Sequence, residues 1–404
     1  MPPKPLHRHQ SSLEGILDFS SQPPLDPIRH EAAARLFNKL IDCFDTLPAD
    51  NDDYSRVILV RLTYEYARTD ESKGNFLRAF FDSAGIPIVN TFNGEEVDLA
   101  DEDQRAALHN SILNFADYLF ENFFLPLKAS TRKTPQPSPA SHAAIRHLQG
   151  DLAFLGTPER VSALRGACLI RDHHRCVITR RFDSNEANKR AKLASREGTV
   201  ARDDEGNPLT RVAPLEVAHI IPHCLTRLNA SNELLRIILL CHSLDDTSKA
   251  TALAILNMFD SGAAYLIEGA NVDRPGNAIT LERNMHYNFG AFEIFFDPIE
   301  GQVHTYRIET FSAFNIHDDL PVTRKLYLTE SRTIDPPLPR LLAIHNAIGH
   351  ILHLSGAGQY IDEILRDLED QVVREDGCTK LDLFVKLKLQ LQGWPSSPAA
   401  EGST

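Results

Sequence analysis

The sequence predicts a mainly helical α+β protein. Apolar residues recur at helical spacing over residues 28–47 and 101–126, and the second segment begins with acidic residues and ends at a proline. Two short stretches further along, RCVITRRF at 175–182 and PLEVAHIIP at 214–222, are rich in β-branched residues and predict strands. Apolar helical patterns then return near the carboxyl end, so helices are expected to outnumber strands.

The first part of the chain is predicted to be a helical region over residues 25–127. Residues 1–24 before it are polar and contain proline, which favours disorder. Within the region, Gly85 and Pro87 indicate that a helix stops. Residues 128–141 (KASTRKTPQPSPAS) are rich in Pro, Ser and Thr and lack apolar periodicity, so we expect a linker.

Patterning after the linker predicts several further elements. They are a polar stretch ending in a turn signal (183–208), one or two helices (231–260), a tight DRPGN loop (273–277), a short helix (278–289), a hairpin (292–308) and helices at 338–354, 360–374 and 380–392. We divide this part into a central domain over 142–330, a helical C-terminal region over 331–393 and a disordered tail over 394–404.

Composition excludes several classes of protein. The 404 residues carry 42 basic and 55 acidic side chains, a net charge of −13, and 42% are hydrophobic, which indicates a globular chain. The negative total argues against a protein that coats DNA with its whole surface. Six scattered cysteines without a CxxC pair, and no signal-peptide pattern, favour an intracellular location. No apolar run is long enough for a membrane helix, so we expect no membrane partner.

Three polar residues lie in apolar, ordered-looking surroundings on three successive elements. His219 lies on the predicted strand at 214–222, Asn277 closes the DRPGN loop, and His286 follows in the next segment. A neutral imidazole can take a proton from water near neutral pH. A second imidazole can bind a divalent metal that polarises a phosphoryl oxygen, and an Asn can fix a loop through hydrogen bonds. Taken singly, each residue has an ordinary structural interpretation as a core histidine, a turn residue or a helix-surface histidine.

Three motifs in order resemble a known family. RCVIT, LEVAHIIPHCL and RPGNAITLERNMHYNFGAF resemble the HNH nuclease domain, and more narrowly the group common in fungal proteins. LHLSGAGQYID at 352–362 is similar to a stretch that follows the domain in those chains, so the resemblance covers about 165–365. It implies a ββα-metal core within 142–330, interrupted by a helical insertion.

The resemblance also implies a function and a role for each of the three residues. His219 would be the general base, Asn277 the positioning residue and His286 a ligand of a divalent metal, with Mg²⁺ favoured over Mn²⁺, Ni²⁺ or Zn²⁺. The implied reaction is phosphodiester hydrolysis in nucleic acid, with DNA as the favoured substrate.

Two positions depart from the family pattern. Ala218 stands where many HNH enzymes have an acidic metal ligand, and Gly290 stands where many have a His or Asp. Neither Glu216 nor His223 can be assigned to the metal from sequence, because Glu216 and His219 lie on opposite faces of a regular strand. Mg²⁺ needs few protein ligands, so the enzyme interpretation stands. The rival interpretation is a degenerate HNH fold that binds nucleic acid or protein without cutting.

A basic stretch indicates where nucleic acid could bind. Residues 165–211 carry eleven basic and seven acidic side chains in an otherwise acidic protein. The candidate phosphate contacts are Arg180, Arg181, Lys189, Arg190 and Lys192. The alternative interpretation is a solvated insertion between two strands, and the sequence favours neither.

Overall fold

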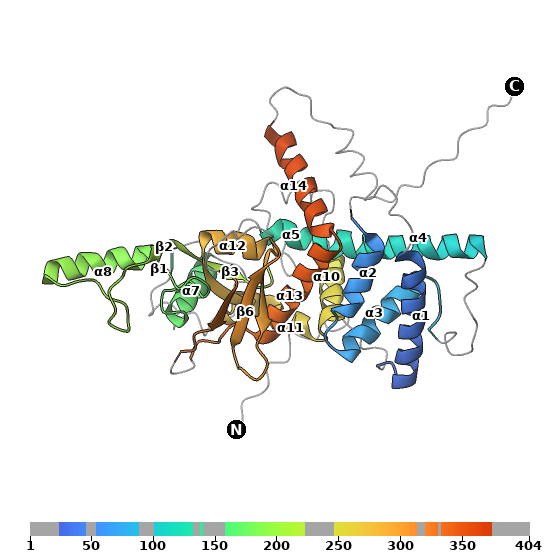
Figure 1. Ribbon diagram of the computed structural model, residues 1–404, viewed down its shortest axis with the longest axis horizontal. Coiled ribbons are helices and arrows are strands. Elements are labelled where there is room, and N and C mark those ends of the chain that lie inside the picture. Colours follow the sequence, from blue (N-terminus) through green and yellow to red (C-terminus); the bar gives the residue numbers. More distant parts are fainter. Residues whose placement is uncertain are drawn as a thin grey trace.

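The structure is a computed structural model that describes residues 24–45, 54–88, 101–131, 138–139, 158–222, 246–312, 320–329 and 333–373. Our predictions for residues 1–23, 231–245, 380–392 and 394–404, and for His223, lie outside these ranges. The fold is a helical α+β mixture with small sheets, as the sequence predicts (Figure 1).

The N-terminal helices extend from one end of the molecule to its centre (Figure 1). They are α1 (Pro27–Asp45), α2 (Arg56–Glu65), α3 (Asp70–Ser83), α4 (Glu102–Leu119), a π-helical turn (Phe120–Phe124) and α5 (Leu125–Thr131). Side-chain oxygens of Ser55, Thr69 and Asp101 cap the N-termini of α2, α3 and α4, each accepting a backbone N–H that would otherwise lack a partner.

The helix does not stop at Pro126, and residues 128–131 of the predicted linker belong to α5. The wider π turn Phe120–Phe124 precedes the proline, and Pro126 is the second residue of α5. A proline is tolerated in the first turn of a helix because its missing N–H has no intrahelical partner there. Lys128 is therefore a buried helical residue that pairs with Asp362 at 2.8 Å, not part of a solvated linker.

One continuous hydrophobic core joins the N-terminal helices to later parts of the chain. Phe123 and Phe124 pack against Phe259 at the end of α10 (Asp246–Phe259), with ring centroids 5.3 and 6.2 Å apart. The backbone N–H of Arg68 also donates to the carbonyl of Phe259. The helical region at 25–127 thus shares its core with the insertion.

The centre of the fold is a two-stranded antiparallel ribbon covered by a helix. Strand β3 (Leu215–His219) pairs with β4 (Ala278–Glu282) in a register that places His219 opposite Ala278. Helix α12 (Arg283–Gly290) follows β4 directly and packs on both strands. The expectation of one helix over 278–289 is therefore wrong for its first five residues, because pairing with β3 decides their conformation.

The predicted strand at 175–182 is mainly a tight turn. The N–H of Thr179 donates to Sγ of Cys176 at 3.4 Å, and the N–H of Arg180 donates to the carbonyl of Cys176. Arg180 adopts a φ of 62°, which reverses the chain. Val177 and Ile178 are buried in this turn, so their β-branched character reflects the core and not a strand.

A helical arm projects from the end of the molecule opposite the N-terminal helices (Figure 1). It consists of α8 (Ser184–Glu197) and the chain that returns from it over 198–211, and we call this unit the arm. Its base is a short parallel pairing of β1 (Phe182–Asp183) with β2 (Val212–Ala213). Asp183 caps the start of α8, and Gly198, with a φ of 69°, ends it.

The remaining elements support the ribbon. They are α7 (Pro158–Arg171), α11 (Ala263–Ile267), the 3₁₀ turns Gly269–Asp273 and Pro275–Asn277, the antiparallel sheet β5 (Ile294–Pro298), β6 (Thr305–Thr310) and β7 (Val322–Lys325), and helices α13 (Pro339–Leu354) and α14 (Ala357–Val373). The predicted hairpin at 292–308 and helix at 338–354 are confirmed. Among the described helices, none is both long and apolar enough to cross a bilayer.

Candidate active site

His219 is the last residue of β3 and is buried beside a carboxylate. Its Nε2 atom lies 3.3 Å from Oδ1 of Asp273, and both side chains are almost fully buried. Asp273 ends the 3₁₀ turn that leads into the DRPGN loop. An ionised carboxylate can only accept a hydrogen bond, so this contact favours the tautomer of His219 that carries its proton on Nε2.

Asn277 holds together the two segments that carry this pair. Its Oδ1 accepts the N–H of Ile221 at 2.9 Å, and its Nδ2 donates to the carbonyls of Ile221 at 2.9 Å and Val272 at 3.0 Å. Ile221 lies two residues after His219, and Val272 lies immediately before Asp273. The buried amide therefore ties the segment that follows His219 to the segment that precedes Asp273.

His286 on α12 is paired with a carboxylate of the ribbon, Glu216 of β3. Its Nδ1 lies 2.8 Å from Oε2 of Glu216, while Oε1 of Glu216 accepts a hydrogen bond from Nε of Arg283 at 3.1 Å. The hydrogen bond from His286, supported by that from Arg283, holds the pKa of Glu216 below its usual value. The ionised carboxylate favours the tautomer of His286 with its proton on Nδ1, which leaves a lone pair on Nε2, an atom of the kind that can ligate a metal.

The contacts of the two imidazoles lead to different elements. Alternation along β3 places Glu216 toward α12 and His219 toward the 3₁₀ turn Gly269–Asp273. The structure thus brings Asn277 to the end of β3 beside His219, and it joins His286 to Glu216. Sequence reasoning found the three polar residues but missed the roles of Asp273 and Glu216. Strand alternation placed Glu216 on the face away from His219, and nothing in the sequence indicated that this face meets His286.

A buried arginine supports the loop that carries Asn277. Arg171, at the end of α7, forms a two-point ion pair with Asp172 and donates to the carbonyls of Pro275 at 2.7 Å and Ala278 at 3.0 Å. The same guanidinium donates to the carbonyl of Asp335, which ties the loop to the C-terminal part of the chain. The Arg171 guanidinium donates all five of these hydrogen bonds from one planar group. A lysine ammonium has only three donors and could not replace it.

Close packing also restricts the loop at Gly276. A Cβ atom there would lie 3.1 Å from Cγ of Leu338, and the N–H of Leu338 donates to the carbonyl of Gly276. Any larger residue would push the loop away from the start of α13. The position of Asn277 therefore depends on both α7 and α13.

The donor set fits a hydrated ion better than a closed metal cage. Within the described ranges, no three His, Cys, Asp or Glu side chains converge as a metal site. Ala218 is buried and offers no ligand, and Gly290 ends α12 without one. Among the described residues, His286 offers a donor atom, Nε2, on a ring held in place by Glu216. An imidazole nitrogen suits ions such as Zn²⁺ or Ni²⁺, and water and substrate phosphate oxygens would fill the remaining positions.

The basic residues named from the sequence divide into two groups. Arg180 lies over the Tyr327 ring at 4.1 Å and donates to the carbonyl of Lys325, and burial lowers its pKa. Arg190 pairs with Glu186 at 3.1 Å and with Asp204 at 2.7 Å. These two side chains are used within the protein.

The other three candidates are more accessible. Arg181 is 40% exposed and lies 3.5 Å from a carboxylate oxygen of Glu282. Lys189 and Lys192 are exposed on α8, so they are the better placed of the five to meet a ligand from solvent.

Comparison with known proteins agrees with this geometry. Residues 176–297 match the family model described as HNH endonuclease, a span that includes the Cys176 turn, the ribbon and α12. No curated protein and no solved structure matches the chain significantly. The match assigns residues 176–297, which include the ribbon, the Asn277 loop and α12, to the HNH endonuclease family.

Proposed function

We propose that this protein is a metal-dependent endonuclease that hydrolyses phosphodiester bonds, with DNA as its substrate. The observation that carries the proposal is the fixed arrangement of His219, Asp273 and Asn277 within a matched HNH domain. A buried histidine oriented by a carboxylate, with both segments held by one amide, has the form of a positioned general base.

In this proposal His219 takes a proton from the attacking water. Because Asp273 holds the Nε2–H group, Nδ1 is the nitrogen that accepts the proton, and the carboxylate stabilises the imidazolium that forms. His286 would hold the metal through Nε2, with Glu216 fixing the ring from the other side. When bound, a divalent ion supplies charge stabilisation to the scissile phosphate and to the leaving oxygen.

A plasmid-nicking assay tests the proposal. The full chain is incubated with supercoiled plasmid and Mg²⁺, Mn²⁺, Ni²⁺ or Zn²⁺, alongside a chelator control and the His219→Ala variant prepared identically. We expect nicking that the chelator abolishes and that the variant reduces by about 10²–10⁴-fold. Cleavage that persists in the variant at the wild-type rate would indicate a contaminating nuclease and overturn the assignment.

A non-cleaving module that binds nucleic acid or protein is the second candidate. Ala218, Gly290 and the lack of a three-residue metal cluster in the described ranges favour it. Under this alternative, duplex binding is retained and no divalent ion produces chelator-sensitive nicking. Binding measured beside the nicking assay therefore separates the two functions.

A further inference from the structure

One face of α8 carries only cations, one amide and one apolar residue. At 3.6 residues per turn, Lys189, Lys192, Leu193 and Arg196 lie within about 100° of one another around the helix axis. All four side chains are exposed, Lys189 by 69% and Leu193 by 56%. Asn185 is the fifth residue on this face, which therefore includes no acid.

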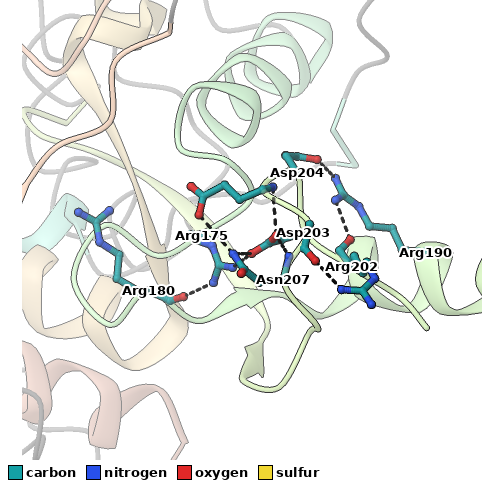
Figure 2. Close-up of polar contacts among 9 residues, drawn as sticks. Arg175, Arg180, Arg190, Arg202, Asp203, Asp204 and Asn207 are labelled. Carbon is teal, nitrogen blue, oxygen red and sulfur yellow. Dashed lines mark hydrogen bonds and ion pairs between the residues drawn. The ribbon is translucent and has the colours of Figure 1, made fainter. Parts of the chain in front are cut away.

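Three of the five acids of the arm form ion pairs with arginines of the protein. Asp203 pairs with Arg175 and also accepts the backbone N–H groups of Glu205 and Asn207. Figure 2 shows Arg175, Asp203 and Asn207 together at the base of the arm, with Arg190 reaching Asp204.

Glu186 completes this network. Its carboxylate pairs with Arg190 at 3.1 Å and reaches Lys189 at 3.5 Å. Folding thus pairs Glu186, Asp203 and Asp204 with Arg175 and Arg190, whereas Glu197 and Glu205 are exposed and no salt bridge within the described ranges involves them. The positive charge of Lys192 and Arg196 then faces solvent without an acidic partner in the described ranges.

The base of the arm lies close to the candidate active site. Ala213 in β2 is six residues before His219, a distance of about 20 Å along an extended chain. That distance corresponds to about six base-pair steps of about 3.4 Å each. The 14 residues of α8 extend about 21 Å further into solvent. The arm is therefore within reach of a duplex bound at His219, about six to twelve base-pair steps from the cleaved bond.

We propose that the arm binds the phosphate backbone of duplex DNA outside the cleavage position, through Lys189, Lys192 and Arg196. This inference rests on the proposed nucleic-acid substrate and narrows its binding site. Arg196 joins the candidate phosphate contacts predicted from the sequence. Arg180 and Arg190 leave that group because their guanidinium groups contact other residues of the protein. The contact is with backbone charge, so it contributes affinity without base specificity.

Salt-dependent binding tests the arm. Fluorescence anisotropy of a labelled random-sequence duplex is measured against salt for the full chain and for the combined variant Lys189→Ala, Lys192→Ala and Arg196→Ala. Loss of three phosphate contacts should reduce the slope of log K against log salt by about 2.7. In the nicking assay, KM should rise while kcat at saturating DNA is unchanged, because the arm lies outside the cleavage position.

The α1 helix supplies a matched control. Combined Arg29→Ala, Arg35→Ala and Lys39→Ala removes the same charge from exposed positions of a helix at the opposite end of the molecule (Figure 1). This control should retain the wild-type slope, and thermal melts should show both variants folded.

The outcomes separate this inference from the proposed function. If the wild-type protein binds and cleaves DNA but the arm variant keeps the wild-type salt slope, the DNA-binding role of the arm is wrong and the proposed nuclease function stands. A reduced slope without any chelator-sensitive nicking supports the arm and overturns the nuclease. If the wild-type chain binds no duplex, the arm is not a DNA contact. The positive charge of its exposed face would then suit an acidic protein surface.

Discussion

Glu216 on β3 and His286 on α12 are joined at 2.8 Å between Oε2 and Nδ1, across 70 residues of sequence. The contact links the strand that ends at His219 to the helix that carries the proposed metal ligand. It gives the imidazole a fixed orientation before any metal arrives.

Glu216→Gln should weaken metal-dependent nicking by about 10–100-fold, because an amide no longer fixes the proton of His286 on Nδ1. Raising the metal concentration should recover much of the loss. The matched control is Arg283→Gln, which removes the other partner of the same carboxylate from a 70% exposed side chain. A Glu216→Gln defect that no metal concentration relieves would contradict a role through the metal.

Asp273→Asn should reduce kcat with little change in DNA affinity. The amide can present either an acceptor or a donor to Nε2, so the tautomer of His219 is no longer fixed. The pH–rate profile provides the decisive measurement, because loss of the carboxylate should shift its acidic limb to lower pH. A uniform loss of rate with an unshifted profile would indicate only a structural role.

Asn277→Ala should both destabilise the fold and reduce nicking. It leaves one N–H and two carbonyls without their buried partner, each at a cost of about 1–3 kcal/mol. The control Asn257→Ala removes a different buried amide, whose Oδ1 accepts from the N–H of Ala264. Urea unfolding and nicking are measured on both. If Asn257→Ala and Asn277→Ala lose the same stability and also the same nicking activity, the effect of Asn277 is on stability and not on the position of His219.

His345 should make the protein less stable in mild acid. Burial between Phe289 and Phe292 lowers its pKa to about 3, so the folded state stays neutral while the unfolded chain takes up a proton near pH 6.5. Stability from this residue is therefore complete above pH 6.5 and falls as the pH drops toward 3. Between pH 7 and pH 5 the loss should be about 2 kcal/mol.

The variant His345→Phe tests this pH dependence. It keeps an aromatic ring in the stack but removes the titrating group and the contact with the carbonyl of Phe289. Urea unfolding at pH 7 and pH 5 should show a difference about 2 kcal/mol smaller than in the wild type. If the wild type and the variant lose the same unfolding free energy between pH 7 and pH 5, groups other than His345 cause the acid sensitivity.

The sequence by itself determined the elements whose apolar residues repeat regularly over a continuous stretch of chain. Helical spacing predicted α13, and alternation around a turn predicted the β5–β6 hairpin. The three motifs that contain His219, Asn277 and His286 resemble the HNH nuclease domain, and a family model described as HNH endonuclease matches residues 176–297.

Tertiary structure decided the elements and contacts that depend on distant partners. Ala278–Glu282 is a strand because β3 supplies its hydrogen bonds, and residues 175–182 turn back because Cys176 accepts the N–H groups that a strand would direct outward. Asp273 meets His219 across 54 residues, a separation over which no periodic pattern extends. Folding brings polar groups that are distant in sequence into contact, and buried polar groups must then find hydrogen-bond partners. The contacts of the candidate site therefore exist only in the folded molecule.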